Sequence, residues 1–283
     1  MAEFEKSLKI ERRMAVENAI EFLESANVLH LPVRKSPRSP KPAKAKSMTI
    51  ALSLKCIDGV VVAADRLFTH SDLSNPNLGV FGSYAKKVFG GEGDHYTALV
   101  AGSGSKDALY SLSGSLLTRF EQEETLQASA LAVENGLEEE LNRLSGKLGE
   151  IPNLSTLVAV SQQSHPALQV FRSEGLVIRA AEPTEVIGVG ENSLVQFLLD
   201  TLYVPHMSVM QGVALAVLVI QQTKKYCPQY CGGVTDVGYL FYGVPHQYDL
   251  TEEEVGDIED VFTEGIKTEA LSVLINEAEK LIS

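Results

Sequence analysis

The sequence predicts an α+β protein built as a four-layer αββα sandwich, with a helical extension at its N-terminus. Predicted strands and helices come in separate blocks: strands, two helices, strands, two helices and a last strand. Such blocks are typical of layered α+β packing rather than of a doubly wound sheet. The chain has 283 residues, of which 45% are hydrophobic, enough for one large core. Two strand blocks and two helix pairs suggest two central sheets with helices outside.

The N-terminal segment is expected to lie outside this domain. Residues 1–30 carry an amphipathic helical pattern, which suits a propeptide or an assembly arm. Residues 31–47 form a basic linker rich in Pro and Lys, with six positive charges and no negative one between Arg34 and Lys46. A solvated linker is favoured over a tether to nucleic acid or an acidic partner, because the segment has no aromatic side chains to stack on bases. The sandwich domain is assigned to residues 48–283.

A predicted hairpin opens the domain. Thr49 starts an alternating strand, Asp58-Gly59 provides a tight turn, and a wholly apolar strand then ends on Asp65. At about 3.3 Å per strand residue, folding around the turn brings Asp65 within about 10 Å of Thr49. A hydroxyl at the start of one strand, beside a carboxylate at the end of its partner, is a candidate nucleophile site.

The remaining elements follow from periodicity and turn residues. Residues 66–85 are rich in Asn, Pro, Gly and Ser and are predicted to form a long loop. Gly102 to Ser105 is predicted to be a strand-to-helix turn, since it lacks a full phosphate-loop pattern. Strands are predicted at 86–89, 96–101, 156–161, 167–172, 176–180, 186–190 and 237–242, and helices at 105–121, 124–146, 192–203, 207–226 and 251–281.

Composition narrows the range of functions. Residues 1–47 have a charge balance of +4 and the rest of the chain −17, giving the net −13, and an acidic body argues against nucleic-acid binding. No apolar run reaches the length of a membrane helix, and no basic stretch leads into an apolar one at the N-terminus, so neither a membrane span nor a secretory signal is expected. The three cysteines suit a reducing cytoplasm, and Cys227 and Cys231 lack further zinc ligands.

Five segments also carry a family resemblance: Thr49 to Asp65, Lys86-Lys87-Val-Phe, Ala98 to Gly102, Ile187 to Gly190 and Tyr230 to Gly233. In this order they resemble proteasome-type subunits. That group of N-terminal nucleophile (Ntn) hydrolases includes the proteasome α and β subunits and the HslV-like peptidases. The first hairpin and the Lys-Lys segment are the most specific parts of the resemblance.

The resemblance implies a threonine-type peptidase or amidohydrolase. In active members the nucleophile is an N-terminal threonine, here Thr49, and its own α-amine is the general base. That amine has a reference pKa of about 7.7–8.0, which a nearby lysine cation lowers further. The resemblance places Lys87 as this lysine and Asp65 as its ion-pair partner. It places the backbone N–H of Leu99 at the oxyanion.

Four departures favour an alternative function. Val189 replaces a serine of the family, while Pro228 and Cys231 replace the aspartate and serine that orient the α-amine. Met48 precedes Thr49, so the amine is free only if translation starts at Met48 or a protease cuts after it. An uncut chain would instead resemble the non-catalytic α-type subunits, which serve assembly or act as scaffolds.

The resemblance also implies a set of partners. We expect a peptide or protein substrate, self-assembly into a ring or a smaller homo-oligomer, and a regulatory ATPase. We expect no cofactor, no metal ion, no membrane and no nucleic acid. The expected location is the cytoplasm.

Overall fold

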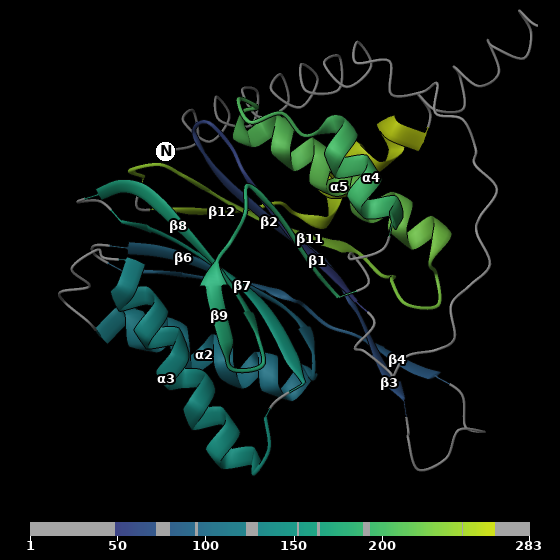
Figure 1. The fold of residues 1–283 in the computed structure, drawn as a ribbon. Helices are drawn as coiled ribbons and strands as arrows, with labels where there is room; N and C mark the ends of the chain where they lie inside the picture. Colours follow the sequence, from purple (N-terminus) through teal and green to yellow (C-terminus); the bar gives the residue numbers. More distant parts are fainter. Residues whose placement is uncertain are drawn as a thin grey trace, which may run out of the picture.

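The computed structural model describes residues 49–71, 80–93, 96–122, 130–151, 153–162, 165–188, 193–244 and 246–263. The predicted N-terminal helix, the basic linker and Met48 lie outside these residues, as does the end of the acidic tail after residue 263. The described residues form antiparallel sheets flanked by helices, so the predicted α+β class is confirmed (Figure 1).

The first five-stranded sheet has the order β10-β1-β2-β11-β12. As predicted, β1 and β2 form a hairpin around Asp58-Gly59, in a register that pairs Ala51 with Ala64. A Cβ atom on Gly59 would lie 1.9 Å from the carbonyl oxygen of Leu240, so the close approach of β11 requires glycine here. The strands are β1 (Ile50–Lys55), β2 (Gly59–Asp65), β10 (Thr184–Gly188), β11 (Thr235–Phe241) and β12 (Gln247–Asp249).

The second five-stranded sheet is a meander in which consecutive strands pair, in the order β5-β6-β7-β8-β9. The ladder between β5 and β6 begins with Val88 opposite Ala101, so Lys87 lies just before the paired region. The strands are β5 (Val88–Glu92), β6 (Tyr96–Gly104), β7 (Leu154–Gln162), β8 (His165–Glu174) and β9 (Val177–Ala180).

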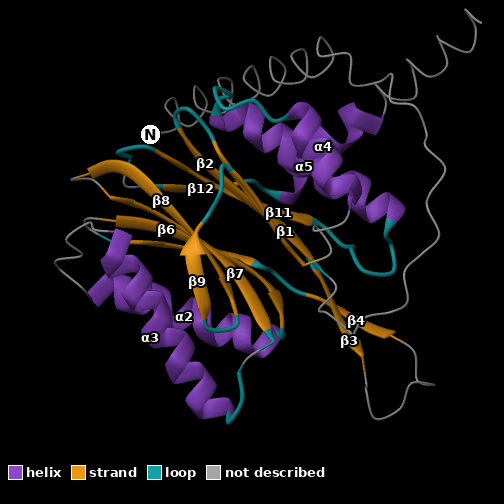
Figure 2. Ribbon diagram, viewed as in Figure 1, coloured by secondary structure: helices purple, strands orange, loops and turns teal. Residues whose placement is uncertain are grey.

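Helices cover the outer faces of the two sheets (Figure 2). On the first sheet lie α4 (Ser193–Leu202), α5 (Val209–Tyr226) and a helix over residues 252–263, and on the second lie α2 (Lys106–Gln122) and α3 (Ala130–Leu148). Alternation along β1 explains the packing on the first sheet. Ile50, Leu52 and Leu54 point to the helices, and Cys56 joins the same buried cluster.

The opposite faces of the two sheets share a core. Small and β-branched side chains dominate this cluster, which allows two sheets to approach closely. The first sheet contributes Ala51, Val60, Val62, Ala64, Ile187 and Leu240, and the second contributes Val88, Leu99, Ala101, Leu157, Ala159 and Val170.

Two strand predictions were incomplete. The segment predicted as a loop contains the two-stranded sheet β3 (Leu67–Ser71) and β4 (Val80–Tyr84), which Figure 1 shows extending from the end of β2. The short strand β12 was missed, because its three residues show no apolar alternation.

Among the described helices, none is long and apolar enough to cross a membrane.

Candidate active site

The β1–β2 hairpin brings Thr49 and Asp65 into direct contact. Thr49 immediately precedes β1 and Asp65 ends β2, so the two residues meet at the same end of the hairpin. The Thr49 hydroxyl donates a hydrogen bond to Asp65 Oδ1 over 2.5 Å, and the backbone amide of Ile50 donates to the same oxygen over 3.1 Å. Both side chains are buried, and Thr49 is only 1% exposed.

Lys87 reaches this pair from the start of the second sheet. Its ammonium donates to Asp65 Oδ1 over 2.9 Å and to the carbonyl of Leu67 over 2.5 Å, and it also contacts the Thr49 hydroxyl oxygen. The ring of Phe68 lies under the ammonium, 4.6 Å away. Burial lowers the pKa of Lys87 from its usual value, although the charge of Asp65 acts in the opposite direction. The structure thus brings all three predicted site residues together.

Asp65 is the centre of this network. Besides Thr49, Ile50 and Lys87, its carboxylate accepts hydrogen bonds from the amides of Leu67, over 3.1 Å, and Gly232, over 3.0 Å. An ionised carboxylate offers about four lone-pair sites, so these donors occupy its accepting capacity. Asp65 is therefore suited to holding its neighbours in place rather than to taking a proton from the Thr49 hydroxyl.

Gly188 packs directly against the backbone of Thr49. It ends β10 with a φ of +78°, and a Cβ atom there would lie 1.9 Å from the Thr49 carbonyl oxygen and 2.7 Å from Ser103 Oγ. Only glycine fits such a position without strain. The contact also places Ser103, at the end of β6, beside the site.

Cys231 is buried next to the same charges. Burial raises the pKa of its thiol, and the negative charge of Asp65 acts in the same direction. A neutral thiol is a weak hydrogen-bond acceptor, so Cys231 cannot replace the hydroxyl of a serine in orienting an amine. Of the other three departures, Pro228 is exposed, whereas Val189 and Met48 lie outside the described residues.

The prediction of Leu99 as the oxyanion donor was wrong. Leu99 is fully buried in the core between the sheets and pairs with Gly90 on one side and Ala159 on the other. A strand that is paired on both sides commits its backbone groups to ladder bonds. Continuing the β5–β6 register by one pair puts Gly102 opposite Lys87, so the β6 backbone nearest the site is at Gly102 and Ser103.

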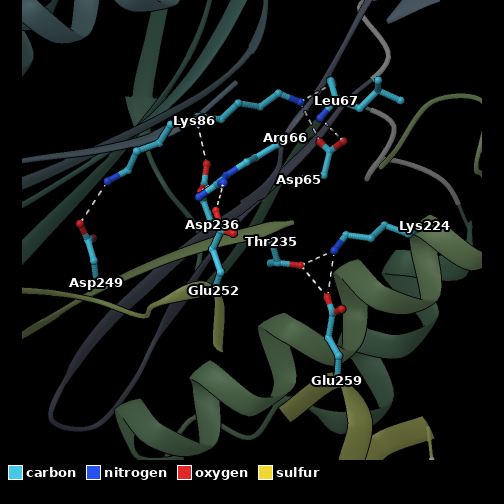
Figure 3. A network of polar contacts seen from close by, with 11 residues as sticks. Asp65, Arg66, Leu67, Lys86, Lys224, Thr235, Asp236, Asp249, Glu252 and Glu259 are labelled. Atoms are coloured by element: carbon cyan, nitrogen blue, oxygen red, sulfur yellow. Dashed lines mark hydrogen bonds and ion pairs between the residues drawn. The ribbon is translucent and has the colours of Figure 1, made fainter. Parts of the chain in front are cut away.

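Two neighbours of the site, Asp236 and Arg66, were not predicted. The carboxylate of Asp236 on β11 accepts a hydrogen bond from the backbone amide of Lys87 over 2.7 Å. It accepts another from the side chain of Arg66, also over 2.7 Å (Figure 3). Lys87 is part of the predicted site, and Arg66 directly follows Asp65. The only signal in the sequence was an acidic residue directly before the strand predicted at 237–242, and its contacts depend on residues far away in sequence.

Within the described residues no three His, Cys, Asp or Glu side chains gather as metal ligands. All three cysteines are described, and none of them forms a disulfide. The arrangement is instead one buried hydroxyl held between a carboxylate and an ammonium.

The fold is similar to solved structures of proteins named Anbu (ancestral beta-subunit). Anbu from Yersinia bercovieri matches with a TM-score of 0.63 and 17% identity, covering 78% of this chain and 95% of its own. A Gly-1 mutant of Anbu from Hyphomicrobium sp. strain MC1 matches with a TM-score of 0.62 and 14% identity, covering 79% and 96%. The helical assembly of the Anbu complex from Pseudomonas aeruginosa matches with a TM-score of 0.60 and 17% identity, covering 79% and 96%.

These matches correct the family resemblance drawn from the sequence. These matches name Anbu proteins, whereas the sequence had indicated proteasome α or β subunits and HslV-like peptidases. At such low identity the similarity establishes a shared fold only. No protein-family model matches the chain, and no curated protein does either.

Proposed function

We propose that the protein is a threonine-type peptidase or amidohydrolase, with Thr49 as its nucleophile once the Thr49 α-amine is free. The observation that carries this proposal is the contact of the Thr49 hydroxyl with both Asp65 and Lys87. We further infer that the two sheets and their outer helices correspond to the αββα sandwich of Ntn hydrolases.

The choice of base follows from the hydrogen bonds. A threonine hydroxyl is a weak nucleophile until a base removes its proton. Asp65 already accepts as many hydrogen bonds as it can, and Lys87 is held in an ion pair with it. The α-amine of Thr49 is the remaining base, and the Lys87 cation beside it would lower the amine pKa below about 7.7–8.0.

The reaction would then run in two stages. The Thr49 Oγ1 atom attacks the carbonyl carbon of the scissile amide while the α-amine takes its proton. A backbone N–H beside the site would stabilise the oxyanion. The C–N bond breaks, the protonated α-amine gives its proton to the leaving amine, and an ester is left on Thr49. Water, deprotonated by the same amine, hydrolyses this ester.

The first test is whether the α-amine exists and matters. We expect intact-mass spectrometry and N-terminal sequencing to find a chain that begins at Thr49. A variant with a specific protease site placed directly before Thr49 makes the test independent of natural processing. The cut form should hydrolyse fluorogenic peptides, whereas the uncut form should not.

Substitutions supply the matched controls. Thr49→Ser keeps a hydroxyl and should retain measurable hydrolysis, whereas Thr49→Ala should lose it while still folding. An inactive cut form would overturn the proposal. Hydrolysis by a chain that still carries Met48 would also overturn it, since another group would then have to be the base.

A second candidate function is a non-catalytic assembly subunit. Thr49 is buried within the intact chain, where its nitrogen is an amide rather than an amine, and Cys231 is a poor partner for an amine. A chain that always keeps residues before Thr49 would make this function the better one. Self-assembly belongs to both candidates, and one of the similar Anbu structures is itself a helical assembly. Multi-angle light scattering would give the oligomer size.

A further inference from the structure

We propose that Asp236 is a positioning residue for the Thr49 centre, which it serves by fixing the backbone of Lys87. This inference rests on the proposed function, because it names a further residue on which the same reaction depends. Its basis is one buried carboxylate whose two oxygens hold two different sides of the site.

The strand direction explains why Asp236 can reach Lys87. Side chains alternate along β11, with Val237 and Tyr239 in the cluster beneath the helices and Leu240 in the core between the sheets. Asp236 has the same parity as Leu240, so it faces the second sheet. There, its Oδ2 atom accepts a hydrogen bond over 2.7 Å from the backbone N–H of Lys87, the residue directly before β5.

The second oxygen of Asp236 holds the other side of the site. Its Oδ1 atom accepts a hydrogen bond from Arg66 Nε over 2.7 Å, and Arg66 directly follows Asp65. The Arg66 guanidinium also bonds to the exposed carboxylate of Glu252. Both bonds are charge-assisted, because the acceptor is a carboxylate. Water competes little for this carboxylate, since Asp236 is only 4% exposed.

Together these bonds fix Lys87 at both ends. Its ammonium is held by Asp65 and its backbone by Asp236. A long lysine side chain has many rotamers, so an ammonium can be placed accurately only when its backbone is fixed as well. Without the Asp236 bond, the segment before β5 would be free to move, and the ammonium would move relative to Thr49.

Asp236→Asn is the decisive substitution, because an amide is nearly the same size as a carboxylate. An amide has one accepting oxygen, so it can serve Lys87 or Arg66 but turns an N–H₂ group toward the other donor. The matched control is Asp249→Asn. Asp249 pairs with Lys86, the residue before Lys87, but this ion pair is exposed.

The activity measurement uses the form that begins at Thr49. We expect Asp236→Asn to lower kcat about tenfold with KM within about twofold, since a small misplacement of a reacting group costs mainly in the chemical step. The acid limb of the pH–kcat profile should move upward, because a displaced Lys87 cation lowers the α-amine pKa less. Asp249→Asn should change neither. A merely structural role for Asp236 would leave the pH profile in place.

A second measurement does not depend on catalysis. Hydrogen exchange at the Lys87 backbone amide, followed by NMR, should become about tenfold faster in Asp236→Asn and stay unchanged in Asp249→Asn. If Asp236→Asn does not fold, Asp236→Ser is measured in the same way. Inactive wild-type protein with the expected exchange would defeat the proposed function but keep the Lys87 tether. An active Asp236→Asn enzyme with an unshifted pH profile, or unchanged exchange, would overturn the inference.

Discussion

At the scale of single residues, Lys87 is a fully buried cation, and removing its charge from water costs free energy. Desolvation opposes the ammonium, and Asp65 is the nearest compensating charge. Removing one partner of a buried ion pair typically costs about 3–5 kcal/mol, because the other charge is left uncompensated. The pair therefore specifies the geometry around Thr49 more than it adds to stability.

The lowered pKa of Lys87 gives a pH-dependent prediction. Between that lowered value and the unfolded value of about 10.4, the unfolded chain binds a proton that the folded chain does not. The free energy of unfolding of the wild type should therefore rise with pH in this window, relative to Lys87→Met, by at most about 1.4 kcal/mol per pH unit. Urea unfolding of both proteins at several alkaline pH values measures this difference. A difference that stays constant or falls with pH would contradict it.

Gly188 supports a second prediction at this scale. In Gly188→Ala a methyl group would meet the Thr49 carbonyl, and the positive φ would be strained as well. We expect a loss of about 1–3 kcal/mol in the free energy of unfolding, and a loss of any activity at Thr49. Gly256→Ala is the control, since a Cβ atom there meets nothing within 4 Å. Equal stability of the two variants would contradict the tight contact at Thr49.

Part of the site could be predicted from local sequence alone. The Asp58-Gly59 turn sets the β1–β2 register, and the register brings Asp65 to Thr49. In contrast, Asp236 was missed because it lies 149 residues from Lys87 in sequence, and Leu99 was wrongly chosen because it was carried over from the family resemblance. Composition misled in one place, because the polar residues between β3 and β4 hid the two strands around them.

At the scale of elements, the tip of the hairpin also organises a helix. Asp58 Oδ1 accepts a hydrogen bond over 2.7 Å from the backbone N–H of Val209, the first residue of α5. Ser208 and Gln211 add a capping box at the same end, with each side chain bonding to the other's backbone. The turn that sets the register of β1 and β2 thus also fixes where α5 begins, which links two elements about 150 residues apart.

This link predicts the effect of Asp58→Ala. Loss of a helix cap costs about 1 kcal/mol, and the same substitution also removes a favoured turn residue, so we expect a loss of about 1–2 kcal/mol. Exposed Glu138→Ala on α3 is the control and should change stability by less than about 0.5 kcal/mol. Chemical denaturation of both variants gives the comparison, and equal midpoints would contradict the role of Asp58 as a cap.

At the scale of the whole molecule, the two sheets are joined by charge as well as by their apolar core. Glu185 on β10 is only 4% exposed and accepts hydrogen bonds from Arg172 on β8, over 2.6 Å, and from Arg179 on β9, over 2.9 Å. These bonds cross from the second sheet to the first, close to the edge of both. A buried carboxylate with two guanidinium partners fixes how the sheets are aligned.

We therefore expect Glu185→Ala to lower the free energy of unfolding by about 3–5 kcal/mol, because the charges of Arg172 and Arg179 would lose the buried carboxylate that compensates them. Glu174→Ala is the matched control. Glu174 also pairs with Arg172, over 2.9 Å, but it is 54% exposed and should contribute at most about 1 kcal/mol. A loss from Glu185→Ala as small as that from Glu174→Ala would show that the apolar core alone aligns the sheets.

The hydrogen bonds of Asp65 also have a consequence for timing. Its donors come from the first hairpin, from the start of the second sheet and from Gly232, directly before β11. A nascent chain that has left the ribosome only as far as β10 would contain Thr49 and Asp65, yet would lack the Gly232 donor and the strand that fixes Lys87. Under the proposed function, chemistry at Thr49 would have to wait until Gly232 and β11 have been synthesised and have folded onto the site, which would shield other unfolded proteins from an incomplete hydrolase.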